Sequence, residues 1–256
     1  MNLHVLLIQP DTVWEDVDNN LIRCDELIKN YPQKTDLIIL PEMFPTGFIV
    51  EPGDSCRSSQ DHILDWMKMK AREYQALVMG SIPYHDEGHW YNRLFSVRPD
   101  GTSQFYDKRH LFTMGEEEKN YCPGQQDILL DFRGWKILPR ICYDLRFPVW
   151  SRNTSGYDLM VLVANWPAER RKVWNILLPA RAIENQAYIA GVNRVGKDGR
   201  GIKYQGGSMI VSPYGDIVSL LDDQEGVLGY TLKKNVLARF RKKFPVLNDR
   251  DQFELK

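Results

Sequence analysis

The sequence has only four cysteines, no long apolar run and no excess of charge of either sign. Four cysteines are too few for a disulfide-stapled scaffold, and no two of them have the C-x-x-C spacing of a zinc or redox motif. No basic leader precedes the N-terminal apolar run, and no stretch is apolar for long enough to cross a bilayer. With 33 Lys and Arg against 34 Asp and Glu, no basic field attracts nucleic acid or anionic lipid. These absences predict a reduced, cytoplasmic protein that binds neither membrane nor nucleic acid.

What is present is the composition of an ordinary globular protein, with 43% hydrophobic and 26% charged residues. A length of 256 residues permits either one large domain or two small ones. No segment has the composition of a flexible linker between two halves. We therefore expect a single domain over residues 1–256.

Three short patterns recur in the same order, at offsets of 122, 111 and 114 residues. The first pattern is a continuous apolar run, which is typical of a buried strand. The third is a Pro-x-Gly turn between apolar runs, which is typical of a hairpin. Each half also opens with an apolar strand, at 3–9 and at 135–142. The repeated pairs are 36–41 and 158–162, 75–80 and 186–191, and 96–101 and 210–215.

Helical periodicity lies between the second and third strands of each half. Residues 63–70 follow capping residues at 59–61, and residues 173–183 carry apolar side chains at three- and four-residue steps, with Pro179 predicted to kink or restart that helix. Strand, helix, strand, helix, strand and hairpin, twice over, predict an α/β fold. In this fold two mixed sheets pack face to face and helices cover the outside.

Three polar residues stand where predicted strands end, which is where open α/β sheets place their sites. Glu42 follows the run 37–41, Lys108 follows the strand 103–107, and Cys142 ends the first strand of the second half. Taken alone, each has an ordinary interpretation: a solvated loop carboxylate, an edge-strand lysine and a buried thiol.

The setting of Cys142 distinguishes it from the other three cysteines. Pro148 follows six residues later and suits the first turn of a helix. A strand-to-helix turn at this point would expose the sulfur and aim backbone N–H groups at whatever bonds to it. By contrast, Cys24 lies in a helical pattern, while Cys56 and Cys122 fall in segments that we expect to be loops.

Three blocks of the sequence resemble the signature motifs of the nitrilase, or carbon-nitrogen hydrolase, superfamily. The resemblance covers essentially the whole chain and keeps the order Glu, Lys, Cys. It implies a four-layer α-β-β-α sandwich with an internal pseudo-two-fold duplication, and a homodimer. The blocks are Pro-Glu-Met-Phe at 41–44, Tyr-Asp-Lys-Arg-His-Leu-Phe at 106–112 and Ile-Cys-Tyr-Asp-Leu-Arg-Phe-Pro at 141–148.

The resemblance implies nucleophilic catalysis by Cys142. A free thiol is mostly protonated at neutral pH, so it needs a cation and a base, which Lys108 and Glu42 supply. Lys108 and the backbone N–H of Tyr143 would stabilise the tetrahedral oxyanion. This chemistry requires no metal and no organic cofactor.

The superfamily also carries a second glutamate in the loop after the lysine. Residues 116–118 are all glutamate, and counting back from Gly124 favours Glu117, although a slip of one residue would choose Glu118. A solvated acidic run remains the ordinary interpretation for at least two of the three.

The segments 142–152, 164–167 and 181–186 resemble the bacterial omega-amidase branch. That branch hydrolyses the terminal amide of 2-oxoglutaramate and 2-oxosuccinamate, so a small anionic amide is the implied partner. Its carboxylate calls for a cation, and Arg146 is the first candidate, with a structural ion pair as the alternative. Residues at strand ends are expected to line the pocket, with core packing as the other interpretation. These are Phe44, Asn165 and Trp166.

Other functions remain open at this point. A nitrilase, a carbamoylase or an aliphatic amidase would share the same three residues and differ only in pocket shape. A Cys-His hydrolase is disfavoured because no histidine stands at a comparable strand end. A non-catalytic binding module on the same fold would have no need to keep Glu42, Lys108 and Cys142 together.

Overall fold

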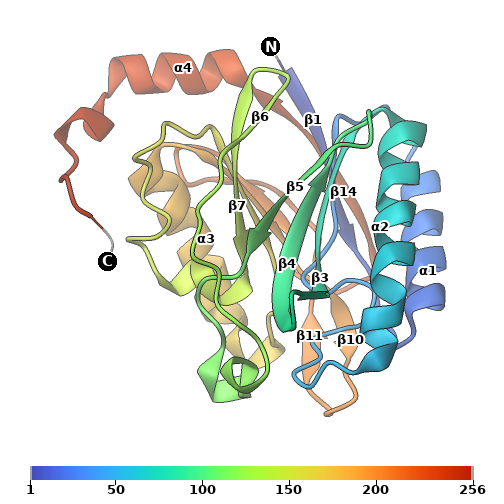
Figure 1. The fold of residues 1–256 in the computed structure, drawn as a ribbon. Helices are drawn as coiled ribbons and strands as arrows, with labels where there is room; N and C mark the ends of the chain where they lie inside the picture. The colour runs from blue at the N-terminus through green and yellow to red at the C-terminus, as the bar shows by residue number, and fades with distance from the viewer. Residues whose placement is uncertain (1, 255–256) are drawn as a thin grey trace.

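The computed structural model describes residues 2–254. Two six-stranded mixed sheets lie face to face, and helices cover their outer surfaces (Figure 1). In that view α1 and α2 lie to the right of the sheets, α3 to the left and α4 across the top. Within the described range, no helix combines the length and the apolar composition needed to cross a bilayer. The expected α-β-β-α layering is confirmed.

The first sheet has the strand order β14-β1-β2-β3-β4-β5, in which β1, β2 and β3 are parallel and the outer pairs are antiparallel. Its strands are β1 (Asn2–Gln9), β2 (Leu37–Ile39), β3 (Leu77–Asp86), β4 (His89–Val97), β5 (Ser103–Asp107) and β14 (Gly226–Lys233).

The second sheet has the order β13-β12-β9-β8-β7-β6, with β7, β8 and β9 parallel. A separate two-stranded hairpin is formed by β10 (Val195–Lys197) and β11 (Lys203–Gln205). The strands of the sheet are β6 (Leu130–Phe132), β7 (Trp135–Ile141), β8 (Leu159–Val163), β9 (Tyr188–Val192), β12 (Met209–Val211) and β13 (Ile217–Leu220).

The predicted duplication is visible in the strand orders. Strands β1 to β5 of the first sheet correspond to β7, β8, β9, β12 and β13 of the second, and an antiparallel strand flanks each half, β14 beside β1 and β6 beside β7. The two hairpin turns also share their hydrogen bonds. Arg98 N donates to Thr102 O at 2.8 Å, and Ser212 N donates to Asp216 O at the same distance.

Alternation along the strands divides the apolar side chains of the two sheets among three core clusters, one between the sheets and one on the outer face of each. In β1, Leu3, Val5 and Leu7 face the second sheet, while Leu6 and Ile8 face α1 and α2. The side chains of the second sheet divide in the same way between the inter-sheet core and α3. Because both faces of each sheet are covered, the central strands β2 and β8 are apolar throughout, as is typical of buried parallel strands.

The α-helices of the described residues are α1 (Val17–Lys29), α2 (Asp54–Tyr74), α3 (Arg171–Asn185) and α4 (Lys234–Lys243).

Helix α2 begins after Gly53, earlier than the capping residues at 59–61 predict. Cys56 therefore lies buried in its first turn, and the loop prediction for this cysteine was wrong. The helical position of Cys24 is confirmed. Pro179 lies inside a continuous α3, so the helix does not restart there.

The second half has no α-helix between β7 and β8. A five-residue 3₁₀ helix, η3 (Cys142–Arg146), follows β7, and the prediction that Pro148 opens a helix was wrong. The reason is local hydrogen bonding by Asn153, whose side chain donates to the carbonyls of Tyr157 and Asn185 at 3.0 and 2.9 Å. Such side-chain bonds compete with a helix for the backbone.

Candidate active site

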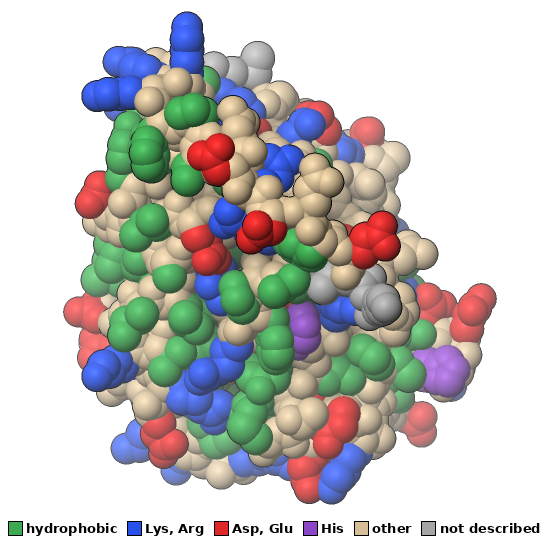
Figure 2. All heavy atoms as spheres, turned by 90° about the vertical axis from the view of Figure 1, so that its left-hand side faces the viewer, with side chains coloured by type: hydrophobic (Ala, Val, Ile, Leu, Met, Phe, Trp, Pro, Cys, Tyr) green, Lys and Arg blue, Asp and Glu red, His purple; other side chains and the backbone are tan. Residues whose placement is uncertain are grey.

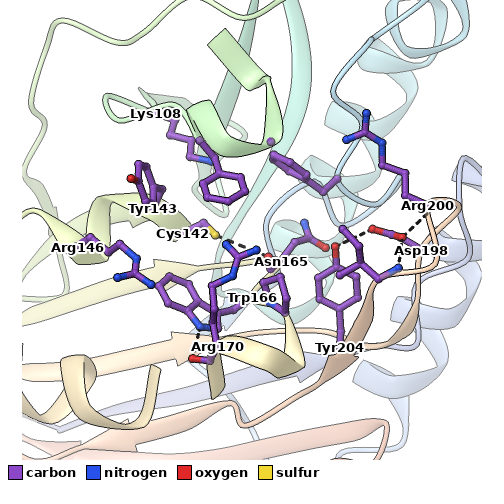
Figure 3. Close-up of a pocket in the computed structure, with 15 residues that line it drawn as sticks. Lys108, Cys142, Tyr143, Arg146, Asn165, Trp166, Arg170, Asp198, Arg200 and Tyr204 are labelled. Atoms are coloured by element: carbon purple, nitrogen blue, oxygen red, sulfur yellow. Dashed lines mark hydrogen bonds between the residues drawn. The ribbon is translucent and has the colours of Figure 1, made fainter. Parts of the chain in front are cut away.

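The ends of three strands bring the candidate residues together. Glu42 follows β2, Lys108 directly follows β5, and Cys142 directly follows β7 of the other sheet. Lys108 and Cys142 line one pocket, together with Asn165, which follows β8 (Figure 3). Face-to-face packing of the sheets thus places residues from both halves of the chain in one site.

Lys108 is fully buried and lies between two carboxylates. Its Nζ donates to Glu42 Oε1 at 2.8 Å and to Glu117 Oε2 at 2.8 Å. Burial opposes the charge, but the carboxylates of Glu117 and Glu42 raise the pKa of Lys108 above its ordinary value. The ammonium group therefore stays charged, and the three groups form a buried ionic cluster.

The short 3₁₀ helix η2 (Glu117–Lys119) turns one glutamate of the acidic run inward. Glu117 is fully buried, whereas Glu116 and Glu118 are exposed. The Phe112 backbone N–H donates to Glu117 Oε2 at 2.7 Å. Burial raises the pKa of Glu117, although the Lys108 charge acts against this rise. Of the glutamates left open by the sequence, Glu117 is the one beside Lys108.

Asn92 on β4 is a member of this cluster that sequence reasoning missed. Its Nδ2 donates to Glu42 Oε1 at 2.8 Å and to Glu117 Oε1 at 3.0 Å. Its Oδ1 accepts from Ser81 Oγ at 2.9 Å, which fixes the orientation of the amide. A single amide thus spaces the two carboxylates around Lys108. No signal in the sequence marks Asn92, because β4 also contains other polar residues, among them an arginine and a serine.

Glu42 also contacts the second sheet. Its Oε2 accepts from the backbone N–H of Asn165 at 2.8 Å, and the Asn165 side chain donates to the Glu42 carbonyl at 2.6 Å. The Asn165 carbonyl lies 3.8 Å from Cys142 Sγ. Asn165 therefore joins the carboxylate to the loop that borders the sulfur.

Cys142 has a left-handed backbone, with φ of 43°. For a residue with a Cβ this conformation is strained, and such strain is concentrated at functional sites. Burial and the negative charge of Glu42 raise the pKa of the Cys142 thiol well above its ordinary value, although Lys108 acts in the opposite direction. The charge of Lys108 is shared by two carboxylates, so the thiol stays neutral and needs a base.

Asp144 holds the turn that carries Cys142. One carboxylate oxygen accepts from the Ile141 N–H at 3.0 Å and from the Tyr106 hydroxyl at 2.8 Å, and the other lies 2.8 Å from His110 Nδ1. Burial disfavours this carboxylate, but the hydrogen bond to His110 helps to keep the pKa of Asp144 below its ordinary value. The residues flanking the sulfur are thus fixed by a buried anion.

Four of the five predicted pocket residues line the cavity: Tyr143, Arg146, Asn165 and Trp166. Phe44 does not line it, and this prediction was wrong. Its ring packs in the core between the first sheet and α2, 5.9 Å from the ring of Trp66. The left-handed backbone of Met43, with φ of 42°, turns Glu42 and Phe44 in different directions.

Most of the remaining wall comes from loop residues that the sequence did not identify as pocket residues. These segments follow β2, β5 and β8 or belong to the β10–β11 hairpin, and the sequence does not show which of their side chains turn toward the pocket. The missed lining residues are Phe48, Phe112, Gly115, Pro167, Arg170, Asp198, Arg200, Ile202 and Tyr204.

Comparisons with known proteins agree with this geometry. The chain is 45% identical to "Omega-amidase YafV" of Escherichia coli over 254 residues, which cover 99% of this chain and 98% of that protein. It is 29% identical to "2-oxoglutaramate amidase" of Bacillus subtilis, over 97% of this chain and 98% of that protein.

Among solved structures, XC1258 of Xanthomonas campestris superposes with a TM-score of 0.97, at 38% identity and over the whole length of both chains. It is described as a CN-hydrolase superfamily protein with an arsenic adduct in its active site. The sequence profile of the carbon-nitrogen hydrolase family matches residues 5–242. The chain belongs to the carbon-nitrogen hydrolase family.

Proposed function

We propose that this protein is an omega-amidase, which hydrolyses the terminal amide of 2-oxo dicarboxylic acid monoamides such as 2-oxoglutaramate to the acid and ammonia. The relatives named omega-amidase and 2-oxoglutaramate amidase support this substrate class. The observation that carries the proposal is the position of Cys142. It stands at the end of a strand, beside the buried cluster of Glu42, Lys108 and Glu117, in a pocket that also holds arginines.

In the first half of the reaction, Glu42 takes the proton of the Cys142 thiol as the sulfur bonds to the amide carbon. The carbonyl oxygen becomes an oxyanion, stabilised by the Lys108 ammonium and the Tyr143 N–H. At the start of a helix such N–H groups have no partner within the helix. Glu42 then gives its proton to the departing nitrogen. The carbon-nitrogen bond breaks, ammonia leaves and a thioester remains.

The second half repeats these roles with water. Glu42 takes a proton from the water as its oxygen bonds to the thioester carbon, and Lys108 again faces the oxyanion. The carbon-sulfur bond breaks, the sulfur recovers a proton from Glu42, and the acid leaves. Glu117 and Asn92 act by position: they keep Lys108 and Glu42 in place during both steps.

The substrate proposed here carries a carboxylate at the end opposite its amide. Arg146 is exposed at the pocket wall, and its guanidinium lies 5.6 Å from the ring centre of Trp166. The alternative of a structural ion pair has no support, because no carboxylate of residues 2–254 lies within salt-bridge distance of it. Arg146 is free to bind an anion.

Ammonia release from a panel of amides tests the proposed function. We expect the highest kcat/KM with 2-oxoglutaramate or 2-oxosuccinamate, and lower values with glutamine, simple nitriles, carbamoyl amino acids and neutral aliphatic amides. Equal or faster turnover of any of the latter compounds would refute the omega-amidase assignment. It would favour one of the related reactions.

The neutral thiol gives a prediction about pH. Because the pKa of Cys142 is raised in the folded protein, its proton is retained at neutral pH and lost only in alkaline solution above the ordinary thiol range. We expect the ultraviolet thiolate absorbance of the wild type, minus that of Cys142→Ala, to be zero at neutral pH. A thiolate signal at neutral pH would show a preformed ion pair with Lys108 instead.

We also propose that residues 1–256 act as one domain in a cytoplasmic homodimer. A nucleophilic cysteine has to remain a free thiol, which a reducing compartment maintains. Exposed apolar side chains stand on and near α3, among them Ile176, Ile183 and Tyr214. Figure 2 shows hydrophobic side chains gathered on the left-hand side of the molecule in Figure 1, where α3 lies. A monomeric mass in light scattering would refute the dimer.

A further inference from the structure

We propose that Arg170, on the 3₁₀ helix η4 (Ala168–Arg170) between β8 and α3, is the residue that binds the distal carboxylate of the substrate. This inference rests on the proposed function and adds the anion site that it requires. Three arginines line the pocket, Arg146, Arg170 and Arg200, and their positions differ.

Arg170 is the partly buried member of the three, whereas Arg146 and Arg200 are exposed. In Figure 3 the side chain of Arg170 runs from its loop toward Cys142, while that of Arg200 extends away from Cys142. A partly buried guanidinium is less screened by water, so its attraction for a carboxylate is stronger than at an exposed position.

One aromatic ring, that of Phe112, lies against the charged group of Arg170. Its guanidinium carbon lies 4.8 Å from the ring centre of Phe112, a cation–π contact. The Phe112 ring in turn lies against Gly115, where an added Cβ would come within 2.5 Å of it. The turn after Lys108 therefore provides a fixed surface on which the guanidinium rests.

The backbone of Arg170 belongs to the loop that borders the nucleophile. Its carbonyl accepts from Trp166 Nε1 at 2.8 Å, and its N–H donates to Pro167 O at 3.0 Å. The preceding Asn165 carbonyl lies 3.8 Å from Cys142 Sγ. One short, hydrogen-bonded loop thus connects the sulfur with the guanidinium, which suits a substrate whose amide and carboxylate are separated by a short chain.

The guanidinium of Arg170 forms no ion pair within residues 2–254, whereas that of the next residue, Arg171, does. Arg171 pairs with Asp222 at 3.0 Å and also donates to the Gln205 carbonyl, so its charge is used in the fold.

Asp198 is the acidic residue of the pocket wall. Its oxygens accept from the backbone N–H groups of Arg200 and Ile202 at 3.0 and 2.9 Å, as well as from the Tyr204 hydroxyl at 2.9 Å. Asp198 thus holds the β10–β11 hairpin, and Arg170 keeps its charge for a ligand.

Calorimetric titration of 2-oxoglutaramate into the Cys142→Ala protein tests this site, because the substrate stays intact there. Adding Arg170→Gln should weaken binding by about 10- to 100-fold, which corresponds to the loss of a hydrogen-bonded charge pair. Arg170→Lys should lose less, because it keeps the charge but not the planar fork. Arg57→Gln, on the outer surface of α2, is the matched control and should bind as before.

The same site is also tested by steady-state kinetics, in an enzyme that keeps Cys142. Arg170→Gln should lower kcat/KM for 2-oxoglutaramate by a similar factor and leave kcat/KM for pentanamide, which has no carboxylate, within about twofold. An equal loss with both amides, or unchanged binding of 2-oxoglutaramate, would refute the site. If Arg146→Gln alone weakens binding, the carboxylate belongs to Arg146. If the wild type does not hydrolyse 2-oxoglutaramate, the proposed function fails, which is a separate result.

Discussion

Replacing Cys142 with alanine should lower kcat by about 10⁴-fold or more, because removal of a covalent nucleophile leaves only the contributions of binding and the oxyanion site. Mass spectrometry should give the same result without kinetics. The wild type, quenched during turnover, should carry the acyl group of the substrate, and Cys142→Ala should carry none. The fold should be retained, since a neutral thiol and a methyl group differ little in their demand for solvation.

Cys122→Ala provides the matched control for this prediction. Cys122 is a partly buried free thiol in a loop, outside the pocket that holds Cys142. This variant should retain full activity and form the same acyl adduct. Full activity of Cys142→Ala, or an adduct that persists in it, would show that another group attacks the amide.

The sequence was sufficient to predict the duplicated sheets and the buried ends of their strands, because these depend on apolar periodicity. Lys108 follows β5 with the bounds that the pattern 103–107 predicts. The end of a predicted strand also distinguishes Cys142 from the other three cysteines, and of the four only Cys142 lines the pocket in the described residues. Such features are local, and each half of the chain repeats them.

Features that depend on long-range contacts or on a single backbone angle were not predictable. The position of Phe44 after the same strand as Glu42 predicts a pocket residue, but the left-handed backbone of Met43 turns its side chain into the core. Asn92 bridges groups 50 and 25 residues away, so no local pattern marks it. Arg170 becomes a pocket residue only through the packing of separate loops.

Replacing Lys108 with methionine should abolish activity and also destabilise the protein, by about 3–5 kcal/mol, since removal of one partner leaves buried charges uncompensated. Lys108 Nζ is the cation between Glu42 and Glu117, and all three side chains are buried. The surface pair of Lys68 with Asp65, at 2.9 Å, gives the control. Lys68→Met should cost at most about 1 kcal/mol and leave kcat unchanged.

The pH dependence of the Lys108→Met effect separates charge from packing. Burial already raises the pKa of Glu117, and without the ammonium the charge that opposes this rise is gone, so the folded state gains stability as pH falls and Glu117 becomes protonated. The deficit measured by urea unfolding should therefore be largest at neutral pH and smaller in mild acid. Adding Glu117→Gln removes one of the two repelling charges and should recover part of the stability but none of the activity. A deficit that is independent of pH would mean that lost packing, not unpaired charge, destabilises the variant. The ionised cluster would then not be what positions Glu42 beside Cys142.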